Sequence, residues 1–282
     1  MQFSVWPNMS HTPAEVLDTA RWADDNGFHG IWYADHYMPN TGSEKIEPGD
    51  VHECWAILPA IAVVTERLRI GSLVSPTSVH HPAVLANRAA TVDHLSNGRL
   101  VLPVGLGVVD DGGFSRVSGE VTSARERAER VDEALEICDL AWRGEAFSYA
   151  GRHHTVEDLV IAPRPVQQPR IPVWPVGGWR SERSMARAAR WDGVVLQRTG
   201  SEEPLDPVDV ADAVSWIAER RGGLAGYDVV VQETLSDDRG RARETAAAAQ
   251  EAGGTWIIDS RWDTGYTPER LLEIARQGPP SG

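Results

Sequence analysis

The stretch PAVLANRAATVDHLSNGRLVLPVGLG, residues 82–107, decides the fold because it contains one helix followed by one buried strand. Its opening proline suits the first turn of a helix, and Asn97-Gly98 is a typical helix end. Residues 99–107 then form a nearly continuous apolar run, which is typical of a strand covered on both faces. The stretch therefore predicts a helix packed beside one strand of a parallel sheet.

The same alternation of helix and strand runs through the whole chain of 282 residues. Eight strands are expected at residues 2–7, 30–36, 69–74, 99–107, 171–176, 193–197, 228–232 and 255–259. Eight helices are expected at residues 13–26, 53–66, 82–95, 124–142, 182–190, 207–221, 239–251 and 268–276. This alternation predicts an α/β fold, a (β/α)8 TIM barrel forming a single domain over residues 1–282, and leaves a doubly wound open sheet as the alternative.

Two segments interrupt the rhythm. Residues 38–52 follow the second strand and are polar, with glycine and proline among them. Residues 144–169 precede the fifth strand and end in a proline cluster. Because the loop after a barrel strand lies over the catalytic face, we expect the first excursion to act as a lid.

The charge balance limits the partners of the chain. With 27 basic and 41 acidic residues the net charge is −14. The surface therefore lacks the basic excess that attracts nucleic acid and anionic membranes. The sequence also has no run of about 18 apolar residues that could span a membrane. We expect a small-molecule substrate, with no nucleic acid and no membrane as partner.

Cysteine and histidine usage argues against disulfides and metals. Cys54 and Cys138 are the only cysteines and have no paired spacing, which favours a reducing compartment. Together with an N-terminus that does not resemble a secretory signal, this predicts a cytoplasmic protein. The pairs His80-His81 and His153-His154 are adjacent in sequence, and adjacent side chains diverge, so no metal site is expected.

Polar and small residues lie where the predicted strands end, which in a barrel is the catalytic face. The second strand ends in Asp35-His36, a carboxylate beside an imidazole that can hold or move a proton near neutral pH. Gly105 and Gly107 end the fourth strand, where small residues let a planar ring or a phosphate approach the backbone. The alternatives are a capping aspartate with a packed histidine, and an ordinary tight turn.

The segment Gly177-Gly178-Trp179-Arg180-Ser181 follows the fifth strand and opens a helix. Two glycines before a helix N-terminus, with Ser181 as its cap, would present free N–H groups and the positive end of the helix dipole to an anion. Arg180 adds positive charge there, and Trp179 lies where a ligand would meet it. The alternative is a normally capped helix with its arginines in solvent.

At this point the chain resembles the bacterial luciferase-like monooxygenase family, in particular its branch that uses the deazaflavin coenzyme F420. The motifs that carry the resemblance occur in family order and are NGFHGIWYADH at 26–36, RLRIGS at 67–72, HPAVLA at 81–86, TVDHLSNGRL at 91–100, and a proline-rich stretch at 163–172 followed by Gly177-Gly178. They cover roughly residues 13–197. The resemblance implies a luciferase-like barrel, a homodimer, and a cofactor at the carboxyl ends of the strands.

The resemblance also implies where the cofactor lies. Its ring is expected against strands two to four, backed by Ser72, Leu73 and Val74, with a non-prolyl cis peptide at Leu73–Val74. Its phosphate is expected at the segment after the fifth strand. Two positions depart from the family pattern: Pro103 stands where the family often has glycine, and Val108 where deazaflavin-dependent sugar-phosphate dehydrogenases have glutamate. A sugar phosphate is therefore not the expected substrate.

These observations lead to one hypothesis and two alternatives. The chain is expected to be an oxidoreductase that transfers a hydride between coenzyme F420 and a small organic substrate. His36, oriented by Asp35, would move the accompanying proton. An FMN-dependent monooxygenase on the same barrel is the alternative within enzymes. A non-catalytic flavin- or deazaflavin-binding homologue is the alternative outside them, and the departures at Pro103 and Val108 keep it open.

Overall fold

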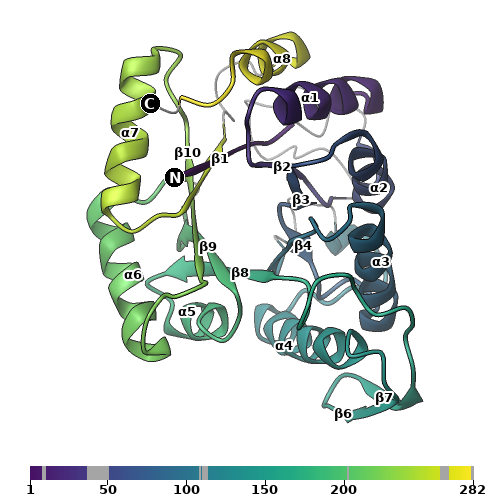
Figure 1. The fold of residues 1–282 in the computed structure, drawn as a ribbon. Helices are drawn as coiled ribbons and strands as arrows, with labels where there is room; N and C mark the ends of the chain where they lie inside the picture. Colours follow the sequence, from purple (N-terminus) through teal and green to yellow (C-terminus); the bar gives the residue numbers. More distant parts are fainter. Residues whose placement is uncertain are drawn as a thin grey trace.

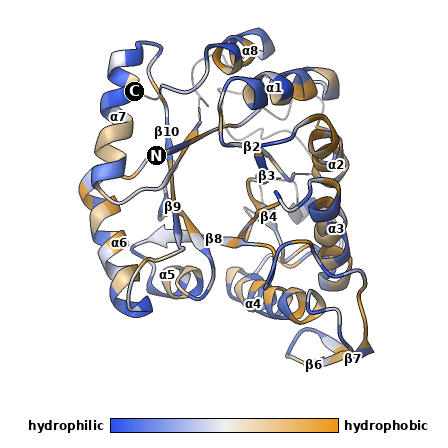
Figure 2. Cartoon of the chain, viewed as in Figure 1, coloured by the Kyte–Doolittle hydropathy of each residue, from blue (hydrophilic) through white to orange (hydrophobic). Residues whose placement is uncertain are grey.

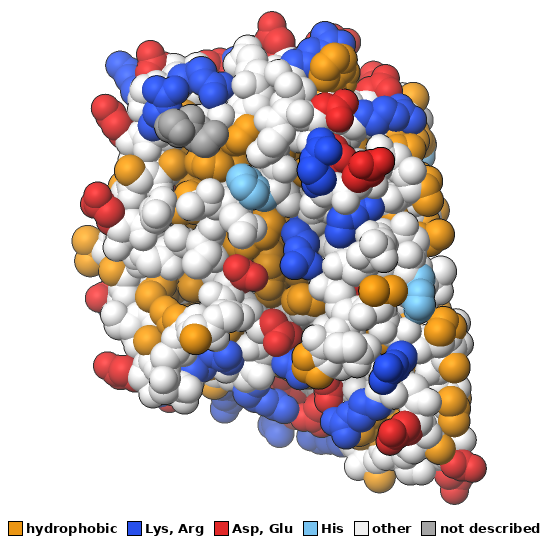
Figure 3. Space-filling model, viewed as in Figure 1, with side chains coloured by type: hydrophobic (Ala, Val, Ile, Leu, Met, Phe, Trp, Pro, Cys, Tyr) orange, Lys and Arg blue, Asp and Glu red, His pale blue; other side chains and the backbone are white. Residues whose placement is uncertain are grey.

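The strands of the chain lie in the middle of the molecule and the helices surround them (Figure 1). The computed structural model describes residues 1–7, 11–36, 51–107, 109, 114–201, 203–260 and 267–280. On the face drawn in Figure 3, hydrophobic side chains gather at the middle of the ring, while acidic and basic side chains are interspersed around its rim. No helix in these described ranges is long and apolar enough to cross a membrane.

The central sheet is a closed parallel barrel. Its strands are β1 (Gln2–Val5), β2 (Gly30–Tyr33), β3 (Arg69–Ser72), β4 (Ser75–Pro76), β5 (Leu102–Gly105), β8 (Val173–Trp179), β9 (Gly193–Arg198), β10 (Asp228–Glu233) and β11 (Trp256–Asp259). They follow the order β3-β2-β1-β11-β10-β9-β8-β5-β4, and a parallel bridge between Ile70 and Leu100 joins β3 to the start of β5. This closure confirms the barrel and excludes the open sheet. The third predicted strand is divided into β3 and β4 at Leu73–Val74.

The helices of the outer ring begin and end close to the predicted positions. They are α1 (Pro13–Asp25), α2 (Cys54–Val64), α3 (Pro82–Leu95), α4 (Ala124–Ala141), α5 (Glu182–Ala188), α6 (Pro207–Arg221), α7 (Arg239–Glu251) and α8 (Pro268–Gln277). The N-terminus of α1 shows why, because Thr12 and Glu15 form a reciprocal capping box just before and within its first turn. Asp206 and Thr267 likewise accept a backbone N–H at the starts of α6 and α8.

The two predicted excursions have different outcomes. The one before the fifth strand forms an antiparallel hairpin of β6 (Phe147–Ala150) and β7 (Thr155–Leu159), outside α4. Its turn is attached to that helix by Glu133, whose carboxylate accepts backbone N–H bonds from Arg152, His153 and His154. The excursion after the second strand cannot be compared, because residues 37–50 lie outside the described residues.

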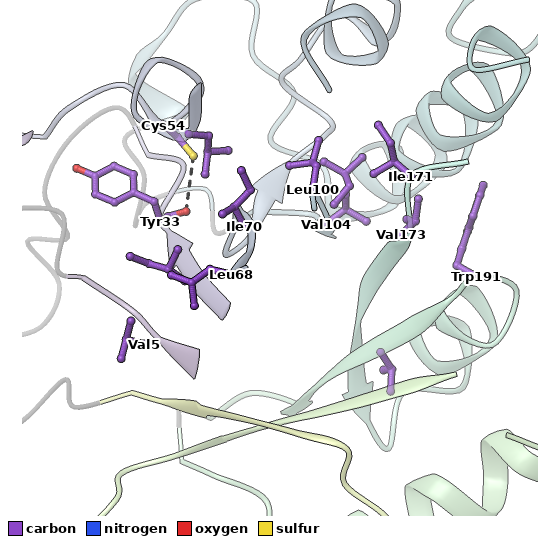
Figure 4. Close-up of a cluster of buried hydrophobic side chains, with 14 of the residues drawn as sticks. Val5, Tyr33, Cys54, Leu68, Ile70, Leu100, Val104, Ile171, Val173 and Trp191 are labelled. Atoms are coloured by element: carbon purple, nitrogen blue, oxygen red, sulfur yellow. Dashed lines mark hydrogen bonds between the residues drawn. The ribbon is translucent and has the colours of Figure 1, made fainter. Parts of the chain in front are cut away.

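One apolar core fills the space between strands and helices. Figure 4 shows part of it, with Ile70, Leu100 and Val104 from the strand side of the core and Cys54 directed at the Tyr33 carbonyl oxygen. The Cys54 thiol lies 3.6 Å from that oxygen. Burial of apolar surface at this scale is the dominant force that holds the helices on the barrel.

A second core fills the lower half of the barrel itself. It is built around Trp32, Trp174 and Trp256, whose ring centroids lie 5.4 to 5.9 Å from one another. Glycines make room for them: a Cβ on Gly193 would lie 2.5 Å from Cδ1 of Trp174. We call these three rings the tryptophan floor. Because they fill the lumen, a ligand can enter only the upper half, at the carboxyl ends of the strands.

Candidate functional site

Above the tryptophan floor, the alternation of the strands decides which side chains face the lumen. Val195 of β9 and Val230 of β10 belong to the interior core and are register partners. Two residues further along each strand, Gln197 and Gln232 therefore lie side by side and face the mouth of the barrel. Neither carboxamide makes a hydrogen bond with any described residue. Sequence reasoning missed this pair, although the period of two from the buried valines was visible.

The wall formed by β3, β4 and β5 is shaped by the close approach of the Val74 side chain to Gly105. The non-prolyl cis peptide predicted at Leu73–Val74 is present. Leu73 belongs to the interior core and Val74 packs against it. A Cβ on Gly105 would lie 2.9 Å from Cγ2 of Val74, so this position requires glycine. Gly107 has φ +71°, the left-handed conformation that also favours glycine.

Asp35 is buried and is engaged by three donors. Its Oδ2 lies 3.1 Å from Trp55 Nε1, 2.8 Å from Ser75 Oγ and 2.9 Å from His80 Nε2. Burial alone would raise the pKa of Asp35, but the hydrogen bonds from His80, Ser75 and Trp55 outweigh it and hold the pKa below its ordinary value. Asp35 is therefore an ionised anchor between β2, α2 and the segment that leads into α3.

The predicted orientation of His36 by Asp35 stays a prediction, because the contacts that the structure describes for Asp35 involve other residues. His36 follows Asp35 directly and is half-buried. Within the described part of the chain, however, the donors to the Asp35 carboxylate are Trp55, Ser75 and His80. The physical reason is that Asp35 turns toward α2 and the segment before α3, where three donors stabilise a buried charge. No signal in the sequence indicated that His80 contacts Asp35, since it drew attention only as part of the adjacent pair His80-His81.

The end of β8 differs from its prediction. The strand continues through Gly177 and Gly178 to Trp179, with Gly177 paired to Leu196 of β9. A Cβ on Gly177 would lie 2.5 Å from Cγ2 of Val194 in β9 and 3.0 Å from Sδ of Met185 in α5, so this glycine leaves room for α5 to pack against the sheet. The N–H group of Gly178 already donates to Ser184 Oγ at 2.9 Å. Ser181 occupies the cap position of α5 but makes no side-chain cap bond.

Arg180 lies beside an aspartate that also binds its neighbours. Its side chain is 72% exposed, and Nη2 lies 3.1 Å from Asp209 Oδ1. The same carboxylate accepts hydrogen bonds from Trp179 Nε1 at 3.1 Å and Arg198 Nη1 at 3.0 Å. The hydrogen bond from Arg180, followed by those from Trp179 and Arg198, lowers the pKa of Asp209. The arginine charge predicted to meet an anion is thus partly neutralised within the chain.

The described chain also has a cavity on its outer wall. A surface cavity of about 390 Å³ on the outer wall is lined by Arg143, Arg170, Arg190 and neighbours, but their charges are paired with Asp139, Asp192 and Glu136. Among the described residues no group of three His, Cys, Asp or Glu side chains is arranged to hold a metal ion. Val108 lies outside those residues.

Comparison with known proteins gives a family match and curated relatives. A family model described as luciferase-like monooxygenase matches residues 1–271. The chain is 34% identical over 170 residues to the F420-dependent glucose-6-phosphate dehydrogenase of Amycolatopsis mediterranei (strain U-32), covering 59% of this chain and 48% of that protein. It is 34% identical over 169 residues to the protein of the same name from Microbacterium testaceum (strain StLB037), covering 57% and 46%. The chain thus spans about half the length of these relatives.

Solved structures resemble the whole chain in fold. The coenzyme F420 dependent tetrahydromethanopterin reductase from Methanopyrus kandleri has a TM-score of 0.78 at 15% identity, covering 98% of both chains. The monooxygenase RslO1 from Streptomyces bottropensis has a TM-score of 0.73 at 21% identity, covering 98% of this chain and 97% of that one. At these identities the likeness shows the fold alone.

Proposed function

Because the chain belongs to the luciferase-like monooxygenase family, we propose that it is an oxidoreductase that transfers a hydride between coenzyme F420 and a small, uncharged organic substrate. The observation that carries the proposal is the wall of Leu73, Val74 and Gly105 at the mouth of a barrel whose lower half is filled by the tryptophan floor. The curated relatives, which are named as F420-dependent dehydrogenases, support the choice of cofactor.

The residues at the mouth fit a planar ring of this kind. The tryptophan floor and Val176 offer an apolar base, and Gly105 removes the side chain that would obstruct a flat ligand. Gln197 and Gln232 offer amide donors and acceptors that no described residue uses. A pocket that is mostly apolar with a few convergent polar groups is the usual form of a cofactor site. When bound, F420 would supply the hydride.

The predicted site residues other than Asp35 receive the following roles in this proposal. Ser72, Leu73, Val74, Gly105 and Gly107 form the wall against the ring. His36, which is half-buried at the mouth, holds or moves the proton that accompanies hydride transfer.

The phosphate end of the cofactor is proposed to lie at the segment after β8, formed by Gly177, Gly178, Trp179, Arg180 and Ser181. Arg198 joins this group, because it shares Asp209 with Arg180 and its buried Nε has no hydrogen-bond partner among the described residues. Since the Gly178 N–H group is already used by Ser184, the guanidinium groups and not the α5 N-terminus carry the proposed recognition.

The substrate is proposed to be uncharged and to face Gln197 and Gln232. Both are neutral amides, and the buried residues below them are apolar. Arg198 alternates to the outer side of β9, where it is bound to Asp209. The described inner wall of β8 to β10 thus presents no cation to a phosphate ester. This supports the expectation, first drawn from Val108, that a sugar phosphate is not the substrate.

One experiment separates this proposal from its alternative, an FMN-dependent monooxygenase. Solved neighbours named as a monooxygenase and as a Baeyer-Villiger monooxygenase in complex with FMN favour that alternative. The purified protein is titrated with F420 and with FMN while tryptophan fluorescence is recorded, because the tryptophan floor lies directly below the mouth. Saturable quenching by F420 and not by FMN is expected. Saturation by FMN alone would replace the proposal with the alternative.

We propose further that the chain forms a homodimer in the cytoplasm. The helix α2 has the sequence CWAILPAIAVV, which contains no charged residue, and Figure 2 shows it as largely hydrophobic. Val63 on its outer face is 64% exposed. An apolar outer helix face of this kind fits a second copy of the chain, since exposed apolar patches mark interaction sites. The two buried free cysteines fit a reducing compartment. Sedimentation velocity at micromolar concentration tests the dimer.

A further inference from the structure

A single carboxylate oxygen joins four separate segments at the mouth of the barrel. Asp35 Oδ2 follows β2, and its three donors come from α2 (Trp55), from β4 (Ser75) and from the segment before α3 (His80). The Asp35 side chain is 9% exposed and the His80 side chain is 12% exposed. Bonds to an ionised acceptor that is shielded from water are the strong kind, so this oxygen fixes the relative positions of the four segments.

From Asp35 the network continues to the wall of the proposed ring site. Ser75 Oγ lies 2.8 Å from Asp35 Oδ2 and 2.8 Å from Ser72 Oγ. Ser75 has one proton to donate, so when it donates to the Asp35 carboxylate, Ser72 donates to Ser75 in place of its longer contact, 3.4 Å, with the Pro103 carbonyl oxygen. Ser72 and Ser75 are the two ends of the turn that carries Leu73 and Val74. We call these four residues the 72–75 turn.

We propose that Asp35 is a positioning residue that acts on the bound ring through Ser75 and the 72–75 turn, with His80 as a further hydrogen-bond partner, and not through His36. The inference rests on the proposed function, which places the ring against Leu73 and Val74. Asp35 does not touch the ring in this account. It holds the wall in place, and the loss of any donor lets the turn shift.

The geometry separates this role from the orientation of His36. If Asp35 acted by orienting the imidazole, its effect would be shared with His36 and would be independent of Ser75. If it acts through the turn, its effect is shared with Ser75 and is independent of His36. Residues in one hydrogen-bond network show non-additive effects, whereas independent residues show additive ones.

The test is a pair of double-mutant cycles read by cofactor binding. The dissociation constant of F420 is measured by tryptophan quenching for Asp35→Asn, Ser75→Ala, His36→Asn and the two double variants that contain Asp35→Asn. We expect Asp35→Asn and Ser75→Ala each to raise the dissociation constant about tenfold, and the double variant to be no weaker than the weaker single one. With His36→Asn the effect of Asp35→Asn should be unchanged.

Matched controls and a rescue guard against a general loss of structure. Ser78→Ala removes a serine nearby whose hydroxyl donates to the Leu106 carbonyl oxygen, and His81→Ala removes the exposed neighbour of His80. Both should bind F420 as the wild type does, whereas His80→Ala should bind it about tenfold more weakly. Ser75→Thr keeps a hydroxyl and should restore binding. Circular dichroism melting confirms that each variant is folded.

Two results have separate meanings. A wild-type protein that binds no F420 would overturn the proposed function and this inference with it. A wild type that binds F420 normally, with folded Ser75→Ala and His80→Ala variants of unchanged affinity, would overturn the inference and leave the proposed function in place. Coupling of Asp35→Asn to His36→Asn, with additivity toward Ser75→Ala, would assign Asp35 to the imidazole instead.

Discussion

Replacing Gly105 by alanine tests the proposed ring site at its tightest point. The added Cβ would lie 2.9 Å from Cγ2 of Val74 and 3.5 Å from Cγ2 of Val176. Ordinary carbon contacts lie at about 3.5–4.0 Å, so the clash with Val74 amounts to roughly 0.6–1.1 Å. Valine has little freedom about χ1, so the 72–75 turn itself has to move. Overpacking of this size costs about 1–3 kcal/mol.

The predicted result has two parts. Gly105→Ala should lower the melting temperature by a few degrees, since about 1 kcal/mol corresponds to roughly 2–4 °C in a chain of this size. It should also weaken F420 binding by about tenfold or more, because the displaced turn carries the proposed wall. Circular dichroism melting and tryptophan quenching measure the two effects separately.

A second substitution tests whether the contact between Gly105 and Val74 causes the predicted losses. Val74→Ala removes the methyl group that the new Cβ would meet, so the double variant should recover part of the stability that Gly105→Ala loses. Gly240→Ala is the matched control: its Cβ would lie 3.0 Å from Asp238 Oδ1, which caps α7, so this variant can change stability but should leave F420 affinity unchanged. A Gly105→Ala protein with the wild-type melting temperature and the wild-type affinity for F420 would show that the contact with Val74 does not define the site.

The remaining predictions concern charge and proton transfer. His36→Asn should leave F420 affinity largely intact and lower turnover by about 10²–10⁴, measured with any substrate that the holoenzyme reduces or oxidises; unaltered turnover would remove His36 from the mechanism. Arg180→Ala should weaken F420 binding by about threefold to tenfold and barely change the binding of a deazaflavin analogue without phosphate. The expected loss is modest because the Arg180 side chain is exposed and already forms an ion pair with Asp209. Burial raises the pKa of Glu233 from 4.5 to about 7. Between these two pH values the carboxyl stays protonated in the folded chain but is ionised in the unfolded chain, so the free energy of unfolding falls as pH rises from about 4.5 to about 7. Glu233→Gln should therefore stabilise the protein at about pH 8, by roughly 1–2 kcal/mol after solvent screening, and not at about pH 4, as urea unfolding at both values would show.

The fold could be predicted from the sequence because its signals are local. The bounds of α6 match the prediction at both ends, since Asp206 and Pro207 mark its start and Gly222 adopts the left-handed conformation that ends it. The predicted ends of strands were less accurate where pairing with a neighbouring strand outweighed the local amino-acid composition. Gly177 and Gly178 suggested a loop, but both are paired with β9 and extend β8 to Trp179.

The site could be predicted only in part because it depends on contacts between distant segments. Asp35 was identified from its place at a strand end, but its partner His80 lies 45 residues away and no local pattern connects them. Gln197 and Gln232 each follow by two residues the register partners Val195 and Val230, so only the register of β9 and β10 relates them. Register follows from packing across the sheet and not from the composition of either strand. The positions of small residues, by contrast, could be predicted from the sequence: Gly105, which was predicted as a site residue, is required by the close approach of the Val74 side chain.

The balance of charge and shape at the mouth indicates which contacts decide cofactor affinity. The chain has a net charge of −14, and the arginines proposed to meet the phosphate are already bound to Asp209. An anion that binds there replaces or joins an existing ion pair exposed to water, so the net gain in binding free energy is small. The ring, by contrast, enters a region closed below by the tryptophan floor, where apolar contact and hydrogen bonds shielded from water are worth more. The residues that shape the wall, Gly105 and Ser75, should therefore affect binding more than Arg180 does.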